Sequence, residues 1–109
     1  MTSQDLADRY YARMRDHDLD GMASLFTETA VVVLPDGREL AGLAAIRGMY
    51  TQIWGAAPSP APHAFIHAAN GVAVEIETHL PDGSSRQTAN FFHLDAQGRI
   101  ERLSIYRRG

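Results

Sequence analysis

The stretch from Arg86 to Arg107 most constrains what this chain can fold into, because it has the pattern of two strands joined by a tight turn. Residues 87–94 and 100–106 both mix β-branched, aromatic and polar side chains in alternation. Between them, residues 95–98 (DAQG) supply the aspartate and the glycine that a hairpin turn requires. The stretch therefore predicts an antiparallel strand pair.

Alternation also assigns the side chains of residues 87–94 to two faces of the sheet. One face carries Thr88, Asn90, Phe92 and Leu94, and the other carries Gln87, Ala89, Phe91 and His93. Because both faces carry an aromatic residue, we expect neither to be fully solvated. Asn90 lies between Thr88 and Phe92 on a largely apolar face, where an amide needs a hydrogen-bond partner or a ligand.

Helical patterns dominate the first half of the chain. Thr2 or Ser3 can cap a first helix, whose apolar stripe consists of Leu6, Tyr10 and Met14 with Ala7 and Tyr11 beside them. Asp18 can cap a short second helix. A third helix is expected between Gly42 and Gly55, with a buried face of Ile46, Met49, Tyr50, Ile53 and Trp54.

Strand patterns make up most of the remainder. We expect strands at residues 29–34, 38–40, 63–69 and 72–80, in addition to the opening pair. The proline-rich segment 58–62 is expected to prevent continuation of the third helix. Helices early and antiparallel strands late are typical of an α+β fold rather than of repeated βαβ units.

The totals limit the class of protein. The chain has 109 residues, 45% of them hydrophobic and 21% charged, which predicts one globular domain over residues 1–109. Its net charge of −3 gives no basic surface for nucleic acid, and the absence of cysteine excludes disulfides and thiolate chemistry. No apolar run has the length of a signal core or a membrane span, so we expect a cytoplasmic protein without membrane contact.

Several short segments, in this order and spacing, resemble the nuclear transport factor 2-like superfamily, which includes ketosteroid isomerase, limonene epoxide hydrolase and the SnoaL-like polyketide cyclases. They are Arg9-Tyr10, Asp18-Leu19-Asp20-Gly21, Leu25-Phe26, the segment from Gly42 to Arg47 with Tyr50, and the segment from Phe92 to Ile100. The resemblance implies a cone-shaped roll, in which three N-terminal helices pack on a curved, mixed and mostly antiparallel sheet. Separately, the convex outer sheet face carries Ala89 and Phe91, which would be exposed in a single chain, so we expect a homodimer formed through this face.

The resemblance assigns roles to four positions. Tyr10 matches the tyrosine of the isomerase's oxyanion hole, and Tyr50 matches a second tyrosine that supports it by hydrogen bonding. Asn90 matches the protonated aspartic acid that shares the oxyanion. Leu34 stands where the isomerase has its catalytic base, and leucine cannot accept a proton. The alternative for Tyr10 is an ordinary core residue whose hydroxyl is tied to a neighbouring polar group.

A base must then come from elsewhere, and His63 and His67 are the candidates. They alternate with Phe65 on one predicted strand face, which lines either the cavity or a subunit surface. Asp36 and Glu39 suit an ordinary turn but also lie near the expected cavity mouth. The two histidines are separated by roughly 13 Å along a strand, too far to share one metal, so we expect no metal and no cofactor.

The function that this pattern favours is proton transfer, with oxyanion stabilisation, on a small apolar carbonyl compound of the polyketide, steroid or terpenoid type. Tyr10, Asn90, His63 and His67 are the predicted catalytic residues. The predicted ligand-binding residues are Tyr50, Met14, Phe26, Leu34, Met49, Trp54, Phe65, Ile76 and Phe92. The alternative is a non-catalytic small-molecule-binding or dimeric accessory protein of the same fold.

Overall fold

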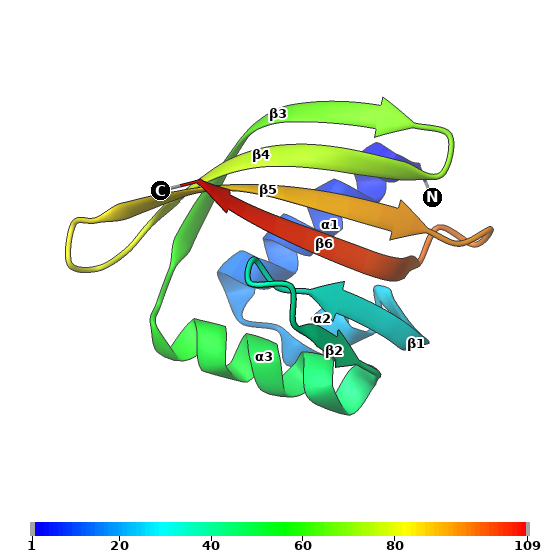
Figure 1. Ribbon diagram of the computed structural model, residues 1–109, viewed down its shortest axis with the longest axis horizontal. Coiled ribbons are helices and arrows are strands. Elements are labelled where there is room, and N and C mark those ends of the chain that lie inside the picture. Colours follow the sequence, from blue (N-terminus) through cyan, green and yellow to red (C-terminus); the bar gives the residue numbers. More distant parts are fainter. Residues whose placement is uncertain (1, 109) are drawn as a thin grey trace.

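The computed structural model describes residues 2–108, which form three helices and one six-stranded sheet (Figure 1). The helices are α1 (Ser3–Asp16), α2 (Leu19–Ala23) and α3 (Leu43–Gly55). The strands are β1 (Phe26–Val33), β2 (Glu39–Ala41), β3 (Ser59–Ala68), β4 (Gly71–His79), β5 (Ser85–Leu94) and β6 (Ile100–Arg108). The predicted α+β class and all three predicted helices are confirmed.

Local side-chain chemistry fixes both ends of α1. The Thr2 hydroxyl accepts a hydrogen bond from the Asp5 N–H, and the Asp5 carboxylate accepts one from the Thr2 N–H, each at 3.1 Å. The helix ends at Asp16 and is followed by His17, whose φ of 52° is left-handed. Asp18 then caps α2 by accepting a hydrogen bond from the Gly21 N–H at 2.9 Å, as predicted.

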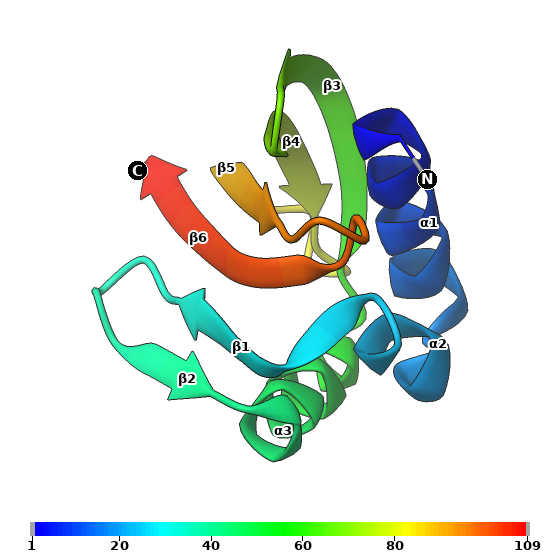
Figure 2. The ribbon, with the colours of Figure 1, turned by 90° about the vertical axis from the view of Figure 1, so that its right-hand side faces the viewer.

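The sheet has the strand order β2-β1-β6-β5-β4-β3. β1 pairs in parallel with β6, whereas the other four pairings are antiparallel, so the sheet is mixed and mostly antiparallel. Figure 2 shows β3 and β6 strongly bent, so that the sheet curls around an interior that α1 and α3 close. The expected cone-shaped roll is therefore confirmed.

The two faces of β5 have the predicted orientation. Asn90, Phe92 and Leu94 are buried, and Phe92 is 2% exposed while its neighbour Phe91 is 42% exposed. The same alternation extends across the sheet, because Asn90 pairs with Val74 on β4 and with Ile105 on β6. Side chains on the buried side form what we call the inner face, and those on the opposite side form the outer face.

β3 begins at Ser59, earlier than predicted, and so includes Pro60 and Pro62. Proline is tolerated here because β3 is an edge strand, where an N–H can go unpaired. Between Pro62 and Ala64 the register shifts: Pro62 pairs with Ile76, and Ala64 pairs with the adjacent residue of β4, Glu75. His63 is therefore the extra residue of a β-bulge.

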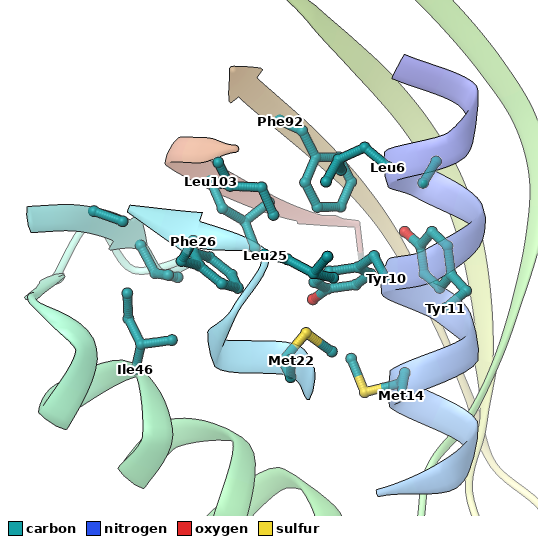
Figure 3. Packing of buried hydrophobic residues seen from close by; sticks show 14 of the residues in the cluster. Leu6, Tyr10, Tyr11, Met14, Met22, Leu25, Phe26, Ile46, Phe92 and Leu103 are labelled. Carbon is teal, nitrogen blue, oxygen red and sulfur yellow. The ribbon is translucent and has the colours of Figure 1, made fainter. Parts of the chain in front are cut away.

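The hydrophobic core lies between the three helices and the inner face of the sheet. Figure 3 shows Leu6, Tyr10 and Met14 projecting from α1 toward Phe92, Leu25 and Met22. The rings of Tyr10 and Phe92 meet edge to face, with their centroids 4.8 Å apart. Backbones also approach closely: a Cβ added to Gly71 would lie 2.4 Å from the carbonyl oxygen of Phe92. In residues 2–108, no helix combines the length and the apolar character needed to cross a bilayer.

Candidate functional site

A cavity of about 500 Å³ opens between α1, α3 and the inner face of the sheet. Much of its wall is apolar, and the polar groups lie at distinct places on it. The lining residues are Tyr10, Met14, Leu34, Pro35, Asp36, Arg38, Met49, Ile53, Ala56, Pro58, Pro60, Thr78, Leu80, Arg86, Thr88, Asn90, Ile105 and Arg107. A volume of this size suits a small organic ligand.

Two tyrosines meet at the inner end of this cavity. The hydroxyl oxygens of Tyr10 and Tyr50 lie 2.6 Å apart, and both side chains are almost completely buried. Tyr10 lines the cavity, whereas Tyr50 lies behind it among core residues. The expected hydrogen bond between these two residues is thus present. If Tyr50 donates to Tyr10, the Tyr10 O–H remains available to a ligand.

Asn90 also lines the cavity, but its protein partner is Tyr11. The Asn90 side-chain N–H donates to the Tyr11 hydroxyl at 3.1 Å, and both residues are buried. The second N–H and the carbonyl oxygen of this amide have no hydrogen-bond partner in residues 2–108. Both groups can therefore serve a ligand. The sequence pattern predicted only that Tyr11 lies beside the apolar stripe of the first helix, and it did not indicate the hydrogen bond to Asn90.

Burial keeps the three phenols protonated. Desolvation raises the pKa of Tyr10 well above its ordinary value of 10, and the neighbouring Tyr50 raises it further. Desolvation is also the main cause that raises the pKa of Tyr11 and of Tyr50. A phenol with a raised pKa is neutral near pH 7, so Tyr10 can donate a hydrogen bond but cannot act as a base there. The cavity wall thus presents two neutral donors, Tyr10 and Asn90.

Leu34 lines the cavity at the end of β1, where the resemblance expects a base. Among the described residues that line the cavity, Asp36 is the only carboxylate. Its two oxygens accept hydrogen bonds from the backbone N–H of Arg38 at 3.0 Å and from the Arg38 guanidinium at 2.7 Å. These contacts, the backbone one first, hold the pKa of Asp36 below its ordinary value of 3.8. Asp36 therefore remains charged near pH 7.

Neither histidine singled out as a possible base lines this cavity. His63 borders a separate depression with Glu75, Gln87 and Tyr106, so it lies on the outer face. The expectation that it shares a face with Phe65 is wrong, because the bulge at His63 inserts one residue and reverses the alternation. His67 does share the inner face with Phe65, but its ring nitrogens bond to side chains of Ser3 at 2.6 Å and Gln4 at 3.1 Å.

The residues predicted to bind ligand divide into two groups. Met14, Leu34 and Met49 line the cavity. The others lie in the core or pack against it: Tyr50, Phe26, Ile76, Phe92, Trp54 and Phe65. Five of these six residues are large aromatic side chains in the core or packed against it, and they do not line the open cavity.

Sequence reasoning missed Arg86, Arg107, Thr78 and Thr88 as cavity residues. A signal for them was present, because Arg86 and Thr88 have the same parity as Asn90 on β5. Extending the inner face toward the start of β5 would have placed Arg86 in the cavity. To predict that Arg107 lines the cavity, one would also need the register of the hairpin, in which Arg107 pairs with Thr88.

The outer face carries exposed aromatic side chains. Phe91 and Tyr106 are 42% and 61% exposed, and their rings meet edge to face with centroids 5.4 Å apart. Together with His93 and Ser104 they border a shallow depression. Across the part of the chain that the structure describes, no three His, Asp or Glu side chains are grouped closely enough to hold a metal ion.

Comparisons with known proteins agree with this architecture. A family model described as a SnoaL-like domain matches residues 7–103. No curated protein matches the chain. Among solved structures, the epoxide hydrolase/cyclase-like enzyme SalBIII, involved in pyran ring formation in the polyether salinomycin, is 20% identical. It superposes with a TM-score of 0.89 over 97% of this chain and 90% of its own.

Two further structures have the same fold. A proposed ketosteroid isomerase from Kribbella flavida is 17% identical, with a TM-score of 0.88 over 98% of this chain and 78% of its own. An NTF2-like protein of unknown function from Cytophaga hutchinsonii is 16% identical, with a TM-score of 0.84 over 99% of this chain and 91% of its own. At these identities the likeness shows the fold alone, which is NTF2-like.

Proposed function

The chain belongs to the SnoaL-like domain family, and from this premise we propose that it acts on a small apolar carbonyl compound by proton transfer with oxyanion stabilisation. Compounds of the polyketide, steroid or terpenoid type have the required apolar body and carbonyl group. The observation that carries the proposal is the pair of neutral donors, Tyr10 and Asn90, in the wall of one largely apolar cavity. A carbonyl oxygen placed between them accepts from the Tyr10 O–H and from the free Asn90 N–H.

These donors stabilise the charge that develops when a proton leaves the carbon beside the carbonyl. The electron pair of the broken C–H bond becomes the enolate double bond, and the negative charge moves to the oxygen. One well-aimed donor is worth about 3 kcal/mol in such a transition state. Burial of Tyr10 and Asn90 favours this role, because hydrogen bonds to charge are stronger where water is excluded. Tyr50 holds the Tyr10 hydroxyl in place.

The proton goes to Asp36, the only carboxylate among the described lining residues. It replaces His63 and His67 in the proposal, because neither histidine lines the cavity. Asp36 is ionised near pH 7 and already lies at the cavity wall. In a β,γ-unsaturated carbonyl compound, return of the same proton to the γ-carbon of the dienolate completes an isomerisation. Alternatively, the enolate carbon attacks a second carbonyl carbon of the same molecule, and the alkoxide that forms takes the proton from Asp36, which completes a cyclisation.

Exchange of α-protons in deuterated water tests this proposal without requiring the natural substrate. 2-Decalone serves as the probe, and the loss of its α-proton signals is followed by NMR. We expect faster exchange with the protein than with buffer, and a reduction of about a hundredfold in that excess rate for Tyr10→Phe or Asn90→Leu. Tyr106→Phe, on the outer face, is the control and should retain the rate. Equal exchange by the Tyr10→Phe and unaltered proteins contradicts the oxyanion role.

A second candidate function is ligand binding without chemistry. It is favoured by Leu34 at the position of the family's base and by the two hydrogen bonds that Arg38 already donates to Asp36. It predicts saturable binding of 2-naphthol, a stable mimic of an enol, together with no protein-dependent exchange of 2-decalone. Binding with exchange supports the catalytic proposal instead.

We also propose that the chain forms a homodimer through the outer face. Phe91 and Tyr106 expose aromatic surface on adjacent strands, and a second copy would cover it. The cavity opens on the inner face, so this association leaves it accessible.

A further inference from the structure

We propose that the ligand of this cavity carries a carboxylate, which Arg86 and Arg107 bind at the cavity mouth. This inference rests on the proposed function, since it assumes that the ligand's carbonyl oxygen lies at Tyr10 and Asn90. It goes further by naming an anionic, amphipathic substrate class. Three observations support it: the register of the strands, the charges around the cavity, and the separation of its polar groups.

Strand register places both arginines on the inner face beyond Asn90. On β5, Thr88 and Arg86 follow Asn90 at intervals of two residues toward the strand start, so all three share a face. Arg107 of β6 pairs with Thr88, and Thr78 of β4 pairs with Arg86. Along the inner face, the Asn90 amide is thus followed by two levels that each hold one hydroxyl and one guanidinium group, Thr88 with Arg107 and then Thr78 with Arg86. The wall becomes more polar and more positive from the closed end to the mouth.

The charges at the mouth are opposite in sign to the charge of the whole chain. The chain has a net charge of −3, yet its cavity is lined by three arginines and a single aspartate. Arg38 and Asp36 form an ion pair with each other at 2.7 Å. Neither Arg86 nor Arg107 forms an ion pair with another described residue. The positive charge of these two arginines therefore remains available to an anion.

Nearby carboxylates leave this charge largely in place. Asp82 lies in the turn before β5. The charge of Arg86 lowers the pKa of Asp82, but it is the weakest of the causes that do so. Asp82 is held mainly by Ser84, which donates to it from its hydroxyl and from its backbone N–H at 2.9 Å. Asp36 would repel an incoming carboxylate, but its own Arg38 partner offsets that charge.

The spacing of these groups defines the ligand. Thr88 and its partner Arg107 lie two residues from Asn90, roughly 7 Å along the strand, and Arg86 lies roughly 13 Å along it. A fused-ring or short-chain apolar body spans this interval, with an oxygen at one end and a carboxylate at the other. Guanidinium groups bind carboxylates with two parallel hydrogen bonds, which orients the ligand as well as retaining it.

The test compares two probes that differ only in the carboxylate: 2-naphthol and 6-hydroxy-2-naphthoate. Their dissociation constants are measured by fluorescence titration at low salt and at high salt. We expect the carboxylated probe to bind about fivefold to tenfold more tightly at low salt, with the advantage shrinking at high salt. Arg86→Gln and Arg107→Gln should each remove much of this advantage while leaving the affinity for 2-naphthol within about twofold.

Arg108→Gln is the matched control, because Arg108 is the next residue along β6 and pairs with Gln87 on the outer face. It should retain the full preference for the carboxylated probe. Equal affinity of the two probes, or an equal loss with Arg108→Gln, overturns the inference. Failure of the proposed function gives a different result: the unaltered protein would then produce no exchange of 2-decalone, whatever the effect of the arginine variants on binding of the two probes.

Discussion

The side-chain amide of Asn90 donates a hydrogen bond to the hydroxyl of Tyr11, 3.1 Å away, and so ties β5 to α1 inside the molecule. The adjacent residue on the helix, Tyr10, bonds instead to Tyr50 of α3. Two neighbouring tyrosines of one helix thus connect it to two different elements. One member of each contact, Asn90 and Tyr10, lines the cavity.

The Asn90–Tyr11 contact predicts coupled effects on stability. Tyr11→Phe and Asn90→Leu each remove one member of a buried hydrogen bond, so each should lower the free energy of unfolding. Their effects should not add: we expect a coupling energy of about 1 kcal/mol in a double-mutant cycle measured by urea denaturation. Additive effects would show that the amide and the phenol do not stabilise each other.

Tyr50→Phe should both destabilise the protein and weaken ligand binding. The substitution leaves the buried Tyr10 hydroxyl without its partner, which should lower the free energy of unfolding by about 1–2 kcal/mol. Tyr10 is then less well oriented, so the affinity for 2-naphthol should fall. Tyr106→Phe, at an exposed position, is the control for loss of a phenolic hydroxyl and should change neither quantity.

The pH dependence of proton exchange distinguishes Asp36 from a histidine as the base. The contacts with Arg38 lower the pKa of Asp36 below 3.8, so its charged, basic form persists through the acidic range and is lost only below that value. Protein-dependent exchange of 2-decalone should therefore stay level from about pH 8 to pH 5. A histidine base has an ordinary pKa of about 6.5, and its protonation would reduce the rate within that interval.

Asp36→Asn is the companion variant for this pH experiment. It should abolish the exchange catalysed by the protein and leave 2-naphthol binding nearly unchanged. A retained rate in Asp36→Asn, or a decline in rate centred near pH 6.5 in the unaltered protein, would falsify the assignment of Asp36 as base.

Two glycines predict stability changes of opposite sign. In Gly71→Ala the new methyl group meets the Phe92 carbonyl oxygen at 2.4 Å, so β4 and β5 must move apart. We expect a loss of about 2 kcal/mol or more in unfolding free energy. Gly48 lies in α3 with no atom within 4 Å of an added Cβ, and Gly48→Ala should stabilise the protein by up to about 1 kcal/mol. Thermal unfolding of both variants measures the contrast.

The proposed dimer predicts a change in molecular mass when the outer face is altered. Phe91→Glu introduces a charge beside Tyr106, where a second copy would otherwise bury both rings. Size-exclusion chromatography with light scattering should give the mass of two chains for the unaltered protein and of one chain for the variant. A monomer at micromolar concentration before substitution contradicts the proposal.

The elements and their faces could be predicted from sequence because they depend on local periodicity. The stripe from Leu6 to Met14 and the alternation from Asn90 to Leu94 both correspond to buried surfaces. The face on which the His63 side chain lies could not be predicted, because a bulge at this residue reverses the alternation of the strand. The bulge depends on how β3 pairs with β4 and not on the residues next to His63 in the sequence. The hydrogen-bond partner of Asn90 could not be predicted either, because Tyr10 and Tyr11 are both buried on the same broad face of α1.

The two edge strands of the sheet affect how copies of this chain associate at high concentration. An unpaired strand edge is a template on which further chains can add and grow into fibrils. Here one edge is β2, which is only three residues long. The other is β3, where Pro60 and Pro62 lack an N–H and where His67 is tied to the start of α1. Strand addition is therefore disfavoured at both edges, which leaves the outer face as the surface for the proposed dimer.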